Sequence, residues 1–278
     1  MKRIFIAAGF LLYVLFAQTG FAQTHSLVKK WSTDTLLKTP ESVLFDGSAK
    51  LLYVSNIDGT PDGKDGKGSV GKVALDGKII ATDWVKGLNA PKGMGLYKNR
   101  LYVADLTEVV VIDVPAAKII AHIPVPGAVF LNDITIDKNG IVYVSDTRTF
   151  KVHKIENNQV STILEGLKGP NGLLAVGADL LILDRGSLLK LAPGGKPVTL
   201  ATDMDAATDG IEMVKPNEYL VSSWVGLVYY VSADGSKQTL LDTREQKINS
   251  ADIGYDAKNR ILYVPTFYKN GIVAYELK

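Results

Sequence analysis

The sequence predicts an all-β protein: a six-bladed β-propeller with four-stranded blades, closed by an N-terminal strand. Three observations predict this fold. A motif repeats about every 40 residues. Each repeat contains several short strand-like runs, and no long stretch shows apolar residues with the 3.6-residue period of a helix. We expect a signal peptide over residues 1–22 and one propeller domain over residues 23–278.

The repeat has six copies, each with a short apolar strand, a turn, and a second strand rich in Leu, Tyr and Val. The copies begin at Pro40, Pro91, Leu131, Pro170, Thr208 and Ser250, so successive spacings are 51, 40, 39, 38 and 42 residues. Two more strand-like runs follow in the complete copies, as in LLKLA and PVTLA after the fourth. Four strands in about 40 residues indicate one propeller blade per copy.

The last copy ends one strand short at Lys278. The segment Leu27–Leu37 precedes the first copy and is strand-like. We expect it to supply the missing outer strand, because closing the ring removes an exposed sheet edge.

The N-terminus is typical of a secretory signal peptide. Lys2 and Arg3 precede an apolar run over residues 4–16, and Gly20 and Ala22 are the small residues of a cleavage site after Ala22. The run is short for a membrane-spanning helix. We therefore expect export to the bacterial periplasm or secretion, with no membrane association once the leader is removed.

Charge and composition exclude several functions. Without Lys2 and Arg3, the remaining 29 basic residues balance the 29 acidic residues, so nucleic acid is not an expected partner. The absence of Cys excludes disulfides and thiolate chemistry, and three His residues give no pattern for a His-ligated zinc site. There is no G-x-S-x-G and no G-x-G-x-x-G motif. We expect a monomer that acts on a small molecule.

Three other features have structural interpretations. The Gly- and Asp-rich segment from Asp58 to Gly71 lacks the spacing of a calcium loop and predicts a long hairpin tip, which could form a rim over a binding site. Asp residues recur at the end of the second strand in three copies, which favours a hydrogen-bonding role; they are Asp105, Asp146 and Asp184. Trp84 and Trp224 could line a mouth of the channel, but packing between blades is the expected role for both.

The start of each inner strand should face the central channel near one mouth. That position carries Glu41, Lys92, Asn132, Asn171, Asp209 and Ala251. Two carboxylates and two amides converging from four blades offer hard oxygen ligands for a divalent cation. The alternative is that these residues only form turns, as P-N-G and T-D-G often do.

On these motifs the chain resembles the regucalcin/gluconolactonase/luciferin-regenerating-enzyme family of six-bladed propellers. The resemblance covers about residues 38–270 and implies metal ligands at Glu41 (PESVLFD), Asn171 (GPNGLL) and Asp209 (TDGIEM). It also implies catalytic roles for Asn132 (LNDITIDKNG), which would position substrate, and for Asp209 as general base. The implied cofactor is a divalent cation, Ca²⁺ first, with Mg²⁺, Mn²⁺ and Zn²⁺ as alternatives.

The chain departs from that family at three positions. Phe130 stands where the sugar-lactone members place an Arg, two residues before the N-D asparagine, which suggests a more apolar ligand. Phe45 replaces a Trp after the first-blade Glu. Lys92 adds a cation to the ring, where it could pair with Glu41 or Asp209 in place of a metal, or hold an anionic substrate from the rim. We predict an ion pair with one of these carboxylates when no cation is bound.

The resemblance implies an exported metal-dependent hydrolase that acts on a lactone or similar ester. The alternative is a non-catalytic propeller, like the NHL-repeat proteins, that binds a peptide, glycan or partner protein. Motifs such as PKGMGLYKNRLYVAD resemble NHL repeats nearly as well.

Overall fold

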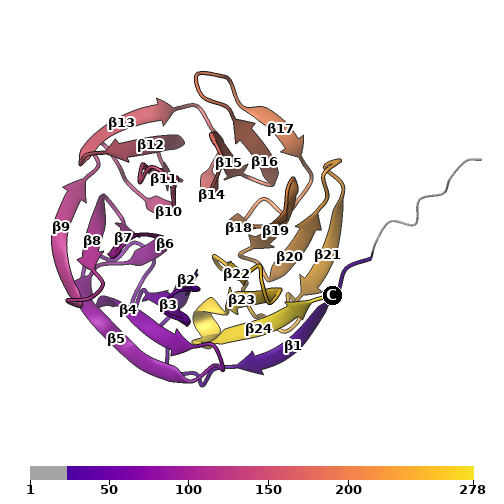
Figure 1. The fold of residues 1–278 in the computed structure, drawn as a ribbon, viewed down its shortest axis with the longest axis horizontal. Helices are drawn as coiled ribbons and strands as arrows, with labels where there is room; N and C mark the ends of the chain where they lie inside the picture. Colours follow the sequence, from indigo (N-terminus) through magenta and orange to yellow (C-terminus); the bar gives the residue numbers. More distant parts are fainter. Residues whose placement is uncertain (1–23) are drawn as a thin grey trace, which may run out of the picture.

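The computed structural model describes residues 24–278; the predicted signal peptide lies outside them. Six four-stranded antiparallel sheets are arranged as blades around a central axis, which confirms the predicted propeller (Figure 1). In each blade the first strand is innermost and the following strands lie progressively farther out. No helix within residues 24–278 has the length and apolar character needed to cross a membrane.

The blades follow the repeat, and their strands are these. Blade 1 contains β2 (Pro40–Asp46), β3 (Leu51–Asn56), β4 (Gly68–Ala74) and β5 (Ile79–Leu88). Blade 2 contains β6 (Pro91–Tyr97), β7 (Arg100–Asp105), β8 (Glu108–Asp113) and β9 (Lys118–Pro124). Blade 3 contains β10 (Leu131–Ile136), β11 (Val142–Asp146), β12 (Lys151–Glu156) and β13 (Gln159–Leu164).

The second half of the ring continues the pattern. Blade 4 contains β14 (Pro170–Val176), β15 (Asp179–Asp184), β16 (Ser187–Leu191) and β17 (Val198–Ala201). Blade 5 contains β18 (Thr208–Lys215), β19 (Glu218–Ser223), β20 (Leu227–Val231) and β21 (Lys237–Asp242). Blade 6 contains β22 (Gly254–Asp256), β23 (Ile261–Pro265) and β24 (Ile272–Leu277), with the short 3₁₀ helix η1 (Phe267–Lys269) between the last two strands.

An N-terminal strand completes blade 6, as predicted. β1 (Leu27–Ser32) pairs antiparallel with β24, from Leu27 opposite Leu277 to Ser32 opposite Val273. The strand ends earlier than the predicted Leu37, because the chain turns away from the outer edge after Thr33. Leu37 itself is buried in an apolar cluster between blades 6 and 1.

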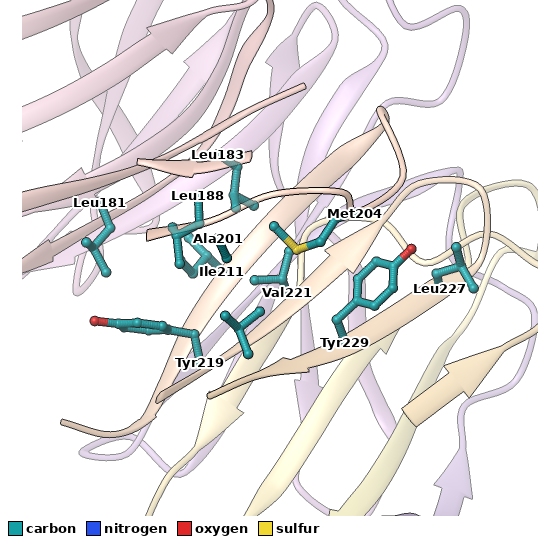
Figure 2. Close-up of a cluster of buried hydrophobic side chains, with 11 residues drawn as sticks. Leu181, Leu183, Leu188, Ala201, Met204, Ile211, Tyr219, Val221, Leu227 and Tyr229 are labelled. Carbon is teal, nitrogen blue, oxygen red and sulfur yellow. The ribbon is translucent and has the colours of Figure 1, made fainter. Parts of the chain in front are cut away.

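Apolar side chains fill the spaces between neighbouring blades. Figure 2 shows one such cluster, in which Leu181 and Leu188 of blade 4 pack with Ile211, Val221 and other residues of blade 5. Full burial of a Leu or Ile side chain stabilises a fold by about 1.5–3 kcal/mol. Comparable clusters between other blades fix the angle between sheets, and therefore the position of each inner strand.

The inner strands are irregular at their first residues. In blades 2–5 the regular pairing with the second strand is interrupted just after the strand begins, for example between Pro170 and Leu173. A glycine follows the channel residue in three of these blades: Gly93, Gly172 and Gly210. A Cβ on Gly172 would overlap the backbone oxygen of Asp209, so glycine allows adjacent inner strands to approach closely. The K-G, N-G and D-G pairs therefore lie within strands, and the turn interpretation of these residues is wrong.

Candidate functional site at the channel mouth

Five of the six predicted ring residues line one cavity at the mouth of the channel. Its volume is about 360 Å³, and its walls include Glu41, Lys92, Phe130, Asn132, Asn171 and Asp209. Phe130 immediately precedes the inner strand β10, and the other five are each the second residue of the inner strands β2, β6, β10, β14 and β18. Ala251 does not line the cavity; it is fully buried just before the short strand β22.

Asp209 and Asn171 form a pair on the cavity floor. The Asn171 amide Nδ2 donates a hydrogen bond of 2.8 Å to Asp209 Oδ1. Asp209 is buried, and burial raises its pKa well above the usual range, an effect that the neighbouring Asp252 carboxylate increases. The hydrogen bond from Asn171 and the charge of Lys92 act in the opposite direction.

Glu41 is buried beside this pair. Its Oε2 atom has no hydrogen-bond partner, which is costly for a buried carboxylate. Burial is the main cause that raises its pKa well above the usual range, and the Asp209 carboxylate adds to the effect, whereas Lys92 opposes it. The two carboxylates therefore repel each other without a proton or a cation between them.

Asn132 is oriented by a short chain of hydrogen bonds. Its Nδ2 donates to Thr147 Oγ1 at 3.1 Å, and Thr147 Oγ1 donates to the Pro170 carbonyl at 2.7 Å. This arrangement commits the nitrogen of the amide to the protein and leaves Asn132 Oδ1 available to a ligand in the cavity.

Lys92 corrects one of our predictions. The side chain is buried, with 1% of the residue exposed, but its ammonium forms no ion pair with Glu41 or Asp209. It instead donates to the carbonyl oxygens of Pro61 (2.7 Å) and Ala90 (3.0 Å) and lies 4.5 Å from the centre of the Phe130 ring. Burial lowers its pKa, with a nearby Glu41 charge opposing this. Carbonyls and an aromatic face satisfy this cation, so no carboxylate needs to approach it.

The predicted rim loop lies beside the cavity. It spans residues 58–67, because β4 already begins at Gly68. Pro61 lines the cavity and accepts the bond from Lys92, and Asp62 forms a 3.1 Å ion pair with Arg148 of blade 3. The Arg148 guanidinium also lies 4.3 Å from the Phe130 ring centre. The loop thus bridges from blade 1 to blades 2 and 3 at the mouth.

An aromatic wall forms another side of the cavity, and sequence reasoning missed two of its members, Phe267 and Tyr268. Trp224, Phe267 and Tyr268 line the cavity together and contact one another edge to face. Trp224 therefore lines the mouth, and its ring also packs against Phe267 of the neighbouring blade 6, so both roles considered for it are present. Trp84 packs between blades 1 and 2, as expected: it contacts Tyr53 and adjoins the apolar cluster that these two blades share. The available signal was the segment TFYKN, an aromatic insertion before the last strand.

A second, smaller chamber of about 230 Å³ lies deeper along the inner strands. Three carboxylates line it: Asp133, Glu212 and Asp252. Ser42 Oγ donates a 2.6 Å hydrogen bond to Asp252, whose pKa burial raises to about 7, and burial raises the pKa of Glu212 to about 8. Asp133 and Asp252 directly follow the ring residues Asn132 and Ala251, a signal that sequence analysis could have used.

The recurring aspartates have the structural role predicted for them. Asp105 accepts hydrogen bonds from the backbone N–H groups of Asn89 and Ala90 at 2.8 Å. Asp146 and Asp184 bind the equivalent N–H groups before blades 3 and 4. Each carboxylate thus fixes the chain just before the inner strand of its own blade.

The cavity residues are compatible with a divalent cation. Within the part of the chain that the structure describes, no three His, Cys, Asp or Glu side chains are grouped as a metal site. The predicted donor set is different, with carboxylates from Glu41 and Asp209 and amide oxygens from Asn171 and Asn132. The unpartnered, buried Oε2 of Glu41 and the adjacent Asp209 carboxyl group fit a hard cation, whose charge would favour the ionised form of both groups. For Asn171, binding requires its amide to present oxygen rather than nitrogen.

Comparisons with known proteins give the same fold. No family model and no curated protein matches this sequence. A streptogramin B lyase structure matches with a TM-score of 0.68 and 9% identity over 91% of this chain and 98% of that one. Virginiamycin B lyase from Staphylococcus aureus, in a catalytically inactive form with quinupristin, matches with a TM-score of 0.63 and 12% identity over 91% and 99%.

A structure of a nidogen/laminin complex matches with a TM-score of 0.65 and 17% identity, over 78% of this chain and 84% of that one. At such identities the likeness concerns the fold alone, and this fold serves both an enzyme and a protein complex among these neighbours.

Proposed function

We propose that the protein is a metal-dependent hydrolase that opens a lactone or a similar ester at the channel mouth. The observation that carries this proposal is the placement of Glu41, Asn132, Asn171 and Asp209, from four blades, around one cavity. The order and spacing of their motifs support the resemblance to the gluconolactonase-type propellers described above.

Glu41, Asn171 and Asp209 are the residues that would hold the cation, with Ca²⁺ the preferred ion. When bound, a divalent cation would supply Lewis-acid polarisation of the ester carbonyl. It would also relieve the repulsion between the two carboxylates, whose pKa values burial raises in its absence.

The chain's own residues then perform the proton transfers. Asp209 accepts a proton from the attacking water as that water adds to the carbonyl carbon. The carbon–oxygen bond of the ring breaks, and the proton passes from Asp209 to the departing oxygen, so a hydroxy acid results. The 2.8 Å bond from Asn171 Nδ2 orients the Asp209 carboxyl before cation binding, and Asn132 positions the substrate through its free Oδ1.

The second candidate is a non-catalytic propeller that binds a partner at this face. The observation that favours it is Tyr268, an aromatic side chain that is 58% exposed at the rim of the cavity. Exposed aromatic residues are common at protein interfaces. The nidogen/laminin neighbour shows that a related fold occurs in a protein complex, without saying what this chain binds.

We also propose that the protein acts as a monomer after export to the periplasm or secretion. The basis for the proposed export is the apolar N-terminal segment with its small-residue cleavage site. Cell fractionation and N-terminal sequencing of the mature protein test this; recovery of the uncleaved chain in the cytoplasm would contradict it.

The hydrolase proposal is tested with purified protein, a panel of lactones and added Ca²⁺, Mg²⁺, Mn²⁺ or Zn²⁺. We expect hydrolysis that EDTA abolishes and that Asp209→Ala removes. Asp34→Ala is the matched control, since Asp34 is exposed and does not line the cavity. If no lactone is hydrolysed under any of these conditions, the hydrolase proposal is contradicted and the non-catalytic binding protein becomes the favoured function.

A further inference from the structure

The cavity at the channel mouth has two chemically different halves. Five of its twelve lining residues are polar, and they form the part of the cavity called the floor here: Glu41, Lys92, Asn132, Asn171 and Asp209. The other seven are apolar or aromatic: Ile57, Pro61, Phe130, Ala207, Trp224, Phe267 and Tyr268. Phe130, Trp224 and Phe267 belong to one apolar cluster, which also includes Ile57. The reacting floor therefore lies next to a continuous apolar surface.

The aromatic wall is held in place by its own segment. The Phe267 ring lies 4.7 Å from that of Tyr268 and 5.5 Å from that of Trp224. Thr266 Oγ1 donates to the Gly271 carbonyl at 2.8 Å, and the side chain of Asn270 accepts a 3.0 Å bond from the backbone of Thr39. These bonds connect η1 to the hairpin between β23 and β24 and to Thr39, which immediately precedes β2 of blade 1.

Phe267 is also strained. It is buried, with 3% exposed, and its φ of 47° lies in the left-handed region, which is unusual for a bulky residue. Such a conformation costs of the order of 1–3 kcal/mol and persists where the surroundings enforce it, often at ligand sites. η1, drawn as the yellow coil in Figure 1, lies at the start of β24, on the side of blade 6 next to blade 1. The strained backbone thus belongs to a residue of the aromatic wall that lines the cavity.

The cavity has room for an aromatic ring beside the reacting group. An apolar cavity of about 150 Å³ can hold a benzene ring. A volume of about 360 Å³, open on one side, therefore accommodates one such ring together with a small lactone or ester group. Hydroxyl groups placed against the aromatic wall would lose water and find few partners, at about 1–3 kcal/mol for each unpaired group.

Resting on the proposed function, we propose that the substrate is a lactone or ester with an apolar, ring-bearing substituent. The ester group lies over Glu41 and Asp209, and the substituent packs against Trp224 and Tyr268. Phe130 extends the same surface from blade 3, and its ring centre lies 4.5 Å from the Lys92 ammonium and 4.3 Å from the Arg148 guanidinium. Trp224 and Tyr268 are specificity-determining residues on this account.

The test compares three γ-lactones of one ring size: γ-butyrolactone, its γ-phenyl derivative, and a derivative with two ring hydroxyls. We expect kcat/KM for the phenyl compound to exceed that for the other two by at least about tenfold, the scale of one good apolar contact. Trp224→Ala and Tyr268→Ala should each reduce the ratio of kcat/KM for the phenyl compound to that for γ-butyrolactone by about 10-fold. Phe150→Ala is the control, because Phe150 is exposed but does not line this cavity.

A binding measurement separates the two proposals. The ketone 3-phenylcyclopentanone keeps the ring, carbonyl and phenyl group but has no ester bond, and calorimetry measures its binding. If no lactone is hydrolysed but the ketone binds and Trp224→Ala abolishes that binding, the hydrolase proposal fails and the ligand class stands. If the hydroxylated lactone has the highest kcat/KM, the proposal of an apolar substrate is overturned and the hydrolase proposal stands. Absence of both hydrolysis and ketone binding overturns both.

Discussion

At the scale of single residues, Lys92 shows how a buried cation can be stabilised without a carboxylate. Its two hydrogen bonds go to backbone carbonyls, and the face of Phe130 lies 4.5 Å away. One of those carbonyls belongs to Pro61 in the rim loop. Lys92 therefore fastens the loop over residues 58–67 to blade 2, which keeps one wall of the cavity in place.

Lys92→Met should loosen this loop because the Pro61 carbonyl loses its donor. We expect hydrogen exchange of amides over residues 58–67 to accelerate by about tenfold, with blade 4 amides unchanged. Lys64→Met is the control, since Lys64 is exposed and forms a single 3.3 Å bond to Thr107. Equal exchange rates in wild type and Lys92→Met would show that the loop is held in another way.

The deeper carboxylates predict a particular dependence of stability on pH. Asp252 faces the charges of Glu41, Asp133, Asp209 and Glu212, and burial raises its pKa to about 7. A raised pKa means that the folded state keeps protons that the unfolded chain releases above about pH 4. Their stabilising contribution is complete below about pH 4 and is lost as the pH rises through about 7 for Asp252 and about 8 for Glu212.

Without divalent cations, the free energy of unfolding should therefore fall between about pH 4 and pH 8. Asp252→Asn should make this decline shallower, because one of the competing charges is removed. Urea denaturation at a series of pH values in EDTA measures the effect, with the exposed Asp34→Asn as control. A decline of the same slope in the wild type and Asp252→Asn would refute the coupling.

At the scale of secondary-structure elements, the start of each inner strand combines an irregular pairing with a close approach to its neighbour. Gly172 permits the approach of β14 to β18 at the point where Asn171 bonds to Asp209. The recurring Asp105, Asp146 and Asp184 fix the backbone immediately before these strands. Together they place polar side chains at one mouth of the channel.

Gly172→Ala should push β14 away from β18, because the new Cβ would overlap the Asp209 carbonyl. We expect a loss of about 1–3 kcal/mol in the free energy of unfolding, measured by urea denaturation, together with loss of lactone hydrolysis. Gly195→Ala, on an exposed turn where the Cβ has more space, should leave both unchanged. Full stability and activity in Gly172→Ala would contradict the role given to this close approach.

The sequence predicted the blades well because each one carries its own local pattern of strands and turns. The closure by β1 was predictable as well, since the last copy lacks a strand and an unused strand-like segment precedes the first. The direction of the Lys92 side chain was not predictable, because its partner Pro61 lies in a loop outside the repeat. Phe267 and Tyr268 were missed for the same reason: they belong to η1, an insertion in a single blade.

At the scale of the whole molecule, the closed ring supports a cavity whose polar groups come from separate blades. Glu41 and Asp209 are 168 positions apart in sequence, yet their charges interact at the channel mouth. The unfolded chain cannot assemble this set of oxygen ligands. A cation that binds them must therefore stabilise the folded ring by mass action.

The melting temperature with and without Ca²⁺ tests this central claim most directly. At a Ca²⁺ concentration about 100 times its Kd, we predict a rise of about 5–10 °C for the wild type. EDTA should reverse the rise, and Asp209→Ala should abolish it, whereas the exposed control Asp34→Ala should retain it. A wild-type melting temperature that responds neither to EDTA nor to Ca²⁺, Mg²⁺, Mn²⁺ or Zn²⁺ would contradict the proposed metal site.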